Sequence, residues 1–183
     1  VALVYAGIAG PDPLDPNSLH QPPVTLDGWD QPDLRGLRLG IYRPWFDHAE
    51  ACIVEDCQAM VDRLVEMGAT VHDIEIPELD EMRVAQVVTI LAEMAANMAA
   101  HEAHWKELSP STRVNLSLGR AATAGDYLQA QRVRTRAINH FRRAFNACDV
   151  ILTPATAVTA PVVPDNCEAD GWSDLSTVTE LMR

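Results

Sequence analysis

Apolar residues recur at helical spacing along residues 125–148. Intervals of three and four separate the apolar positions Ala130, Val133, Ala137, Phe141, Ala144 and Cys148. This spacing is typical of one face of a helix with a period near 3.6. Asp126 is a favourable N-cap residue, and Gln129, three positions later, suits a capping box. Residues 149–154 follow as a short apolar run, so the pattern predicts a long helix leading into a short buried strand, of the kind central in α/β sheets.

Two further strands are predicted from alternating apolar and polar positions, in residues 37–42 and 69–76. Residues 51–67 between them have helical periodicity, and Gly68 stands where a left-handed C-terminal cap belongs. The predicted buried face of this helix is formed by Ile53, Met60, Val61, Leu64 and Met67. Strand, helix and strand form a βαβ unit, so the two strands should be parallel with a right-handed crossover.

Residues 79–108 are rich in Ala and Met and are apolar on more than one side. They predict a helix that is buried on two sides or that lines a cavity. Residues 112–118 predict a short helix, and residues 10–36 and 155–172 predict loops. The first nine residues resemble the end of an apolar helix, and the last eleven resemble the start of a capped amphipathic one. We therefore expect an internal segment of a longer protein, truncated at both ends.

Composition restricts the class of protein. A chain of 183 residues with 48% apolar content forms one domain or part of one. A formal net charge of -12 argues against a nucleic-acid partner, because binding phosphate requires a surplus of Lys and Arg. No run reaches the ~20 apolar residues of a transmembrane segment. The four cysteines have no disulfide spacing, which favours free thiols and a cytoplasmic location.

Arg134 departs from the pattern of the long helix. At roughly 100° per residue it falls within the apolar stripe, between Ala130 and Phe141. A guanidinium keeps its charge and therefore needs a carboxylate, carbonyl groups or a ligand anion. Two interpretations remain open from the residues alone: a structural ion pair, or a cation in the wall of a substrate pocket.

Other residue clusters carry little catalytic signal. His101, Glu102 and His104 share a short segment, but no HExxH motif supplies a metal site, so we expect a partly exposed helix end and no metal. Cys52 and Cys57, near His48, are five positions apart and point differently, so a thiol nucleophile is not indicated. No phosphate-binding glycine loop or nucleophile elbow occurs, and we expect no cofactor.

The long helix and the strand after it carry a family resemblance. The string from Leu118-Gly119 through Asp126-Tyr127-Leu128, Ala130-Gln131 and Arg134 to residues 149–154, DVILTP, resembles the amidase signature family. Residues 34–41, LRGLRLGI, are similar to its L-K-G-L-R-I-G strand. Residues 67–74, MGATVHDI, are similar to the strand that follows it in the family. The start of the chain, with Gly10 and Asp12, is similar to the segment after the family's core signature.

The resemblance implies an α/β fold, namely part of the amidase-signature fold with a mixed sheet flanked by helices. Residues 1–183 would be one partial domain of it. It also implies amide hydrolysis by a Ser–cis-Ser–Lys triad. The Gly- and Ser-rich run that bears the two serines does not occur in this chain. The single lysine of the chain, Lys106, does not match the catalytic lysine of the family. We therefore name no catalytic residue and expect the chain alone to be inactive.

The resulting hypothesis is a segment of an amidase that shapes the substrate side of the pocket. Arg134 resembles an arginine that helps to hold the substrate carboxylate in glutamine-using relatives, and Tyr127 and Thr156 are the further candidate substrate-binding residues. The partner would be a small amide, and truncated sheet edges would favour self-association. The alternative is a non-catalytic α/β module that binds a ligand or another protein.

Overall fold

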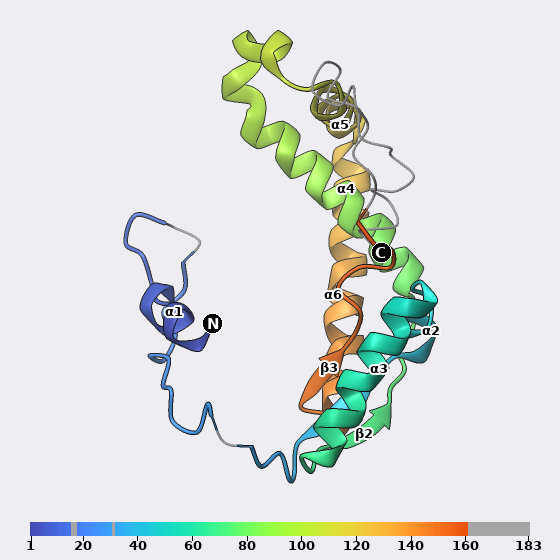
Figure 1. Ribbon diagram of the computed structural model, residues 1–183. Coiled ribbons are helices and arrows are strands. Elements are labelled where there is room, and N and C mark those ends of the chain that lie inside the picture. The colour runs from blue at the N-terminus through green and yellow to red at the C-terminus, as the bar shows by residue number, and fades with distance from the viewer. Residues whose placement is uncertain (16–17, 31, 161–183) are drawn as a thin grey trace. The chain divides into compact units, whose positions relative to one another are not determined.

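The computed structural model describes residues 1–15, 18–30 and 32–160, which divide into two compact units. The first unit comprises residues 1–34. It contains helix α1, Ala2–Ile8, which has no buried residue. The described residues after α1 in this unit form no further helix or strand, as predicted for a loop. The second unit begins at Arg35 and contains the sheet and the remaining helices (Figure 1). The predicted amphipathic helix start at the end of the chain lies outside the described residues.

The sheet has three parallel strands in the order β2-β1-β3. They are β1, Arg38–Ile41, β2, Thr70–Asp73, and β3, Val150–Leu152. Leu39 of β1 lies opposite Val71 on one side and Val150 on the other. The parallel pair of the predicted βαβ unit is therefore confirmed. All described pairings are parallel, so the antiparallel part of the expected mixed sheet is not among these strands.

The prediction of a buried, central β3 was wrong for the sheet that the structure describes. β3 is an edge strand, and Val150 is 41% exposed. The central strand is β1, in which Leu39 and Ile41 are almost completely buried. An uninterrupted apolar run does not distinguish a central strand from an edge strand that receives cover on one face.

Helix α3, Ala51–Glu66, connects β1 to β2 after the short helix α2, Arg43–Phe46. Gly68 has a φ of 108° and ends α3 as predicted. Its N–H donates to the Val65 carbonyl, and the next N–H, of Ala69, donates to the Leu64 carbonyl, which is the Schellman pattern. Val61 is buried on the face of α3 that packs on Ile41 and Phe46. Met60, predicted on that face, is instead 50% exposed.

The predicted helix over residues 79–108 is interrupted. Helix α4 covers Leu79–Asn97 and continues as a 3₁₀ segment, η1, over Met98–Glu107. His101 leaves helical geometry with φ −103° and ψ 17°. Arg120 of the next helix lies over the Trp105 ring, 4.6 Å from its centroid, and pairs with Glu102. These contacts hold η1 against the helix that follows it, and an Ala-rich propensity pattern does not reveal them.

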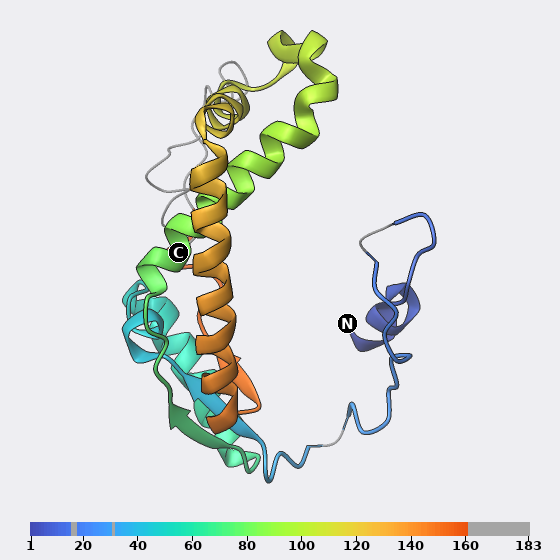
Figure 2. The same cartoon turned by 180° about the vertical axis from the view of Figure 1, so that it is seen from behind.

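Helix α5, Pro110–Ala121, is longer than the predicted 112–118 segment and crosses α4 closely. A Cβ added to Gly119 would collide with the Leu91 carbonyl of α4. Helix α6, Ala124–Ala147, follows and packs against α4. Figure 2 shows the two helices crossing at an angle.

The predicted cap of α6 was wrong. Thr123 is the N-cap, and its hydroxyl accepts from the Asp126 N–H while the Asp126 carboxylate accepts from the Thr123 N–H. Asp126 is thus the third residue of a capping box, and Gln129 is not its partner. Thr and Asp are both favourable N-cap residues. The sequence pattern therefore predicted a capping box that begins three residues too late in the chain.

Two further apolar clusters join elements of the second unit: one fixes the sheet to α6, and the other joins two helices. One joins Ile74, Ile76, Ala144 and Cys148, at the junction of the strand end and α6. The other joins Ala85 of α4 to Ala130 and Val133 of α6. The face of α4 that continues from the second cluster opens into a groove.

Candidate functional site

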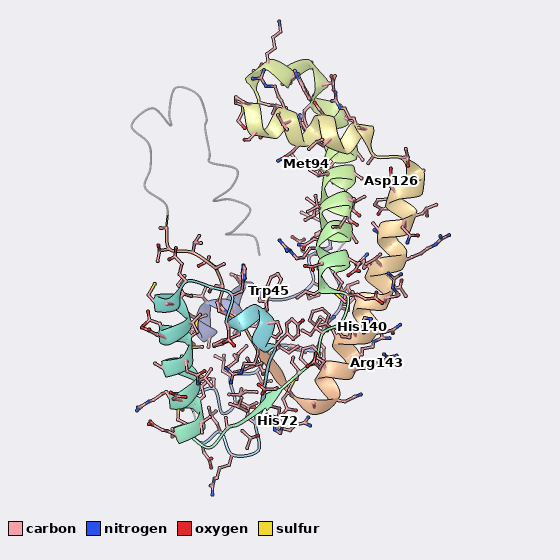
Figure 3. All side chains as sticks on the ribbon, turned by 90° about the vertical axis from the view of Figure 1, so that its right-hand side faces the viewer. Trp45, His72, Met94, Asp126, His140 and Arg143 are labelled. Carbon is pink, nitrogen blue, oxygen red and sulfur yellow. The ribbon has the colours of Figure 1, made fainter. Side chains whose placement is uncertain are left out.

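Helices α4 and α6 enclose a groove of about 410 Å³. It is lined by Met82, Ala85, Gln86, Thr89, Ile90, Glu93, Arg134 and Ala137. The apolar part of the lining comes mainly from α4, so this Ala- and Met-rich helix lines an open groove. It is not buried on two sides, since Val84 and Val87 are 66% and 52% exposed. Figure 3 shows the two helices side by side, with Met94 on α4 and Asp126 on α6 towards one end.

Polar side chains connect the two helices beside this groove. The Tyr127 hydroxyl donates to Glu93 Oε1 at 2.8 Å. Gln131 Nε2 donates to Thr89 Oγ1 at 3.1 Å, and its Oε1 accepts from Arg134 Nη1 at 3.3 Å. The three α6 residues lie about one helical turn apart, so they project on one side of the helix. Gln131 thereby holds Arg134 at the groove.

Arg134 is an exposed residue in this arrangement, not a core one. Within the part of the chain that the structure describes, its guanidinium forms no salt bridge, and its hydrogen bond goes to the neutral Gln131. The ion-pair interpretation therefore has no support in these residues. The helical wheel misplaced Arg134 because only part of the apolar stripe is covered: Ile138 and Phe145 are 44% and 47% exposed.

The pKa of Tyr127 is raised by its hydrogen bond to the Glu93 carboxylate and by partial burial, while the nearby positive charge of Arg134 opposes this shift. The phenol therefore remains a hydrogen-bond donor at neutral pH. Glu93 and Arg134 place one negative and one positive group on the same groove. The groove can bind an apolar chain that carries a polar or anionic end.

Glu93, Thr89 and Gln131 were not predicted as site residues. Glu93 did carry a signal, since it is the one carboxylate within the apolar residues 87–100. Glu93 is therefore the same kind of exception as Arg134 on the opposite helix, because each is a charged residue within an apolar pattern. Gln131 and Thr89 have no such signal, because exposed polar residues are ordinary on helices.

Thr156 lies at a different place. It is exposed after β3 and lines a small hollow with Trp45, His48 and Pro154. The structure thus brings Tyr127 and Arg134 to one groove and leaves Thr156 at the carboxyl edge of the sheet, where open α/β sheets commonly bind ligands.

The carboxyl edge also holds a larger cleft, of about 580 Å³. Tyr42 and Trp45 follow β1, and residues 75–81 follow β2 and begin α4. Figure 3 shows Trp45 on α2, near the first turn of α4. The cleft shares Trp45 and His48 with the hollow of Thr156.

Two members of the segment considered for metal binding form ion pairs with other residues. Glu102 pairs with Arg120, and His104 lies 3.0 Å from Glu107. Among the described residues, no group of three or more potential ligands is arranged to hold a metal ion. Cys148 is buried, and burial raises the pKa of its thiol, which disfavours the reactive thiolate.

Comparison with known proteins decides the family. The model of the Amidase family matches residues 1–180. The chain belongs to the amidase signature family. The family that the resemblance implied is therefore confirmed.

The most similar relatives include enzymes named for amide hydrolysis. The chain is 36% identical to a fatty acid amide hydrolase of Medicago truncatula, over 99% of this chain and 31% of that protein. It is 32% identical to an amidase of Pseudomonas putida, over 99% of this chain and 39% of that protein. The chain thus spans about a third of the length of these relatives.

Solved structures agree in fold. A structure from an inhibitor-bound vestigial complex related to an s-triazine catabolic enzyme matches with a TM-score of 0.75 and 25% identity, over 90% of this chain and 36% of that one. A glutamyl-tRNA(Gln) amidotransferase chain from Thermotoga maritima matches with a TM-score of 0.71 and 18% identity, over 98% of this chain and 38% of that one. No helix in the described part of the chain has the length and apolarity required to cross a membrane.

Proposed function

We propose that this chain is part of an amidase that hydrolyses the C–N bond of a carboxylic amide. The family match over residues 1–180 carries this proposal. Relatives named as a fatty acid amide hydrolase and an amidase support it, since both are similar over 99% of the chain. The same matches do not favour the alternative of a non-catalytic binding module.

The contribution of residues 79–137 is to shape the side of the pocket that holds the substrate. The apolar α4 wall, with Met82 and Ile90, suits an acyl chain. Arg134 supplies a cation for a carboxylate or another electron-rich end, and Tyr127 keeps Glu93 oriented through its hydrogen bond. Thr156 is a second, separate contact at the sheet edge.

The attack on the amide requires groups that these residues do not supply. The serine-rich run that the family resemblance implies is absent from the 183 residues. The groove therefore acts by binding and orientation, which lower the barrier by holding the carbonyl in position for the nucleophile. The 183-residue chain alone should not hydrolyse amides.

Three properties of the chain bear on its location, its partner and its self-association. Cys52, Cys57 and Cys148 are free thiols, which supports a cytoplasmic location. The acidic composition supports a small amide rather than nucleic acid as partner. The outer edges of β2 and β3 have no strand beside them within the described residues, which supports self-association of the isolated chain.

The test uses a longer protein that contains this segment, with Arg134→Met and a matched control, Arg132→Met, on the exposed face of α6. For amides that carry a distant carboxylate, Arg134→Met should raise KM about ten-fold, because one charge-assisted hydrogen bond is lost. For fully apolar amides KM should change little. Arg132→Met should leave KM unchanged for both classes of amide.

Two results would contradict the proposal at different levels. If the longer wild-type protein hydrolyses no amide in a broad panel, the amidase function is wrong. If it does, but Arg134→Met and Arg132→Met have the same KM for both classes of amide, the role of the groove is wrong while the function stands.

A further inference from the structure

The cleft at the carboxyl ends of β1 and β2 has the size and position of a ligand site. Its volume of about 580 Å³ falls within the range usual for small-molecule pockets. It is separate from the α4–α6 groove, since the two share no lining residue. It shares Trp45 and His48 with the small hollow of Thr156 at the same edge of the sheet.

The charges around the cleft do not balance. Four carboxylates line it, those of Glu75, Glu78, Asp80 and Glu81. Arg136 of α6 neutralises Glu78 with a 2.7 Å contact, and Arg83 lies 3.6 Å from Asp80. Glu75 and Glu81 form no hydrogen bond or ion pair with residues that the structure describes. Among the described residues, these two carboxylates therefore have no salt-bridge partner.

An aromatic wall stands beside these carboxylates. The Arg83 guanidinium lies over the Trp45 ring, 5.6 Å from its centroid. Arg83 is thus a cation of the protein itself that is held between an aromatic face and a carboxylate at this cleft. Tyr42 adds a second aromatic side chain, and Ile76, Pro77 and Leu79 add hydrocarbon surface to the lining.

We propose that this cleft binds an organic ammonium ion. The uncompensated carboxylates attract the positive charge, and the aromatic and aliphatic wall takes the hydrocarbon part. An anion is disfavoured by the same excess of carboxylates, and a neutral amphiphile would leave Glu75 and Glu81 without a counter-charge. A bare metal ion would not use the aromatic wall. This inference does not depend on the α4–α6 groove, which shares no lining residue with the cleft.

Benzylammonium is a suitable probe because benzyl alcohol and benzoate have a similar size with neutral and negative ends. Binding to the 183-residue chain is followed by NMR, through the indole N–H signal of Trp45, which the Trp45→Phe variant identifies. Benzylammonium should bind about ten-fold more tightly than benzyl alcohol, as a cation–π contact combined with an exposed ion pair reaches that range. Benzoate should bind more weakly than either.

The double variant Glu75→Gln/Glu81→Gln should remove the preference for the cation. Both side chains lack partners within the described structure, so the fold should persist, which circular dichroism checks. The matched control is Glu55→Gln/Asp56→Asn, which removes the same charge from the exposed side of α3. It should keep the preference. High salt should weaken benzylammonium binding to the wild-type chain.

Three outcomes would overturn the proposal. One is equal affinity for benzylammonium and benzyl alcohol in the wild-type chain. Another is an unchanged preference in the Glu75→Gln/Glu81→Gln variant. The third is an equal loss of preference in the α3 control, which would mean that the overall negative charge, and not this cleft, attracts the cation.

Discussion

The phenol of Tyr127 on α6 donates a hydrogen bond of 2.8 Å to the carboxylate of Glu93 on α4. It connects two helices through residues that are 34 positions apart in the sequence. Because Glu93 also lines the groove, the same contact stabilises the helix pair and fixes the direction of a charged group in the candidate site.

Tyr127→Phe should lower the free energy of unfolding of the chain, because Glu93 loses its donor. The raised pKa of Tyr127 also gives a pH signature. The contribution is present below the ordinary tyrosine value of 10.0 and is lost as the pH rises through the higher folded-state pKa. Urea unfolding at neutral and alkaline pH measures both effects. Tyr5→Phe, on exposed α1, is the control and should show neither.

Gly119→Ala should destabilise the α4–α5 contact by about 1–3 kcal/mol, because the added methyl group overlaps the Leu91 carbonyl and the helices have to separate. Gly125→Ala is the matched control. Its Cβ would lie no closer than 3.5 Å to its nearest neighbour, so it should gain up to about 1 kcal/mol from helix propensity. Thermal unfolding of both variants compares them. Equal stability of the two would contradict the close crossing.

Thr123→Ala should cost about 1 kcal/mol of unfolding free energy, because the Asp126 N–H loses its acceptor at the start of α6. Gln129→Ala should be close to neutral. The pair separates the observed capping box from the one predicted from the sequence, in which Gln129 is the third residue. Urea unfolding is the measurement, and a larger effect at Gln129 would favour the box that begins at Asp126.

The bidentate pair of Arg38 and Asp149 should give an acid-sensitive contribution to stability. Arg38 Nη2 lies 2.7 Å from Asp149 Oδ1, and the hydrogen bonds from Arg38 lower the Asp149 pKa to about 2. A lowered folded-state pKa stabilises above the ordinary value of 3.8, and this is lost as the pH falls towards about 2. Arg38→Met should remove that part of the acid dependence. Arg63→Met, at the exposed Glu66 pair, should not.

Local signals predicted the elements whose patterns are set by their own residues. The βαβ unit, the Gly68 cap and the long helix all follow from periodicity and from glycine's tolerance of positive φ. The motif order was sufficient to identify the family. The capping box was misplaced for a local reason, because Thr123 and Asp126 both suit an N-cap. Other errors arose where the structure depends on remote partners. The helix breaks at His101, and contacts between α5 and η1 accompany this break.

The candidate site was less predictable than the fold. The helical pattern indicated that Arg134 was unusual, but it predicted that Arg134 would lie among core residues. In the structure Arg134 donates to Gln131 and lines an open groove. Trp45 and the carboxylates of the sheet-edge cleft gave no recognisable motif. They become neighbours only when the ends of β1 and β2 lie side by side, so a one-dimensional pattern cannot show them.

The position of β1 between β2 and β3 has a consequence for the order of folding. β1 can meet β2 after the short helix α2 and helix α3, whereas its contact with β3 joins Arg38 to Asp149 across 111 residues. Closing so long a loop delays the encounter more than it weakens the final pairing, because closure entropy grows only with the logarithm of length. Pairing of β1 with β3 should therefore be a late step in folding, and lengthening the connection between α4 and α5 should slow folding more than it lowers stability.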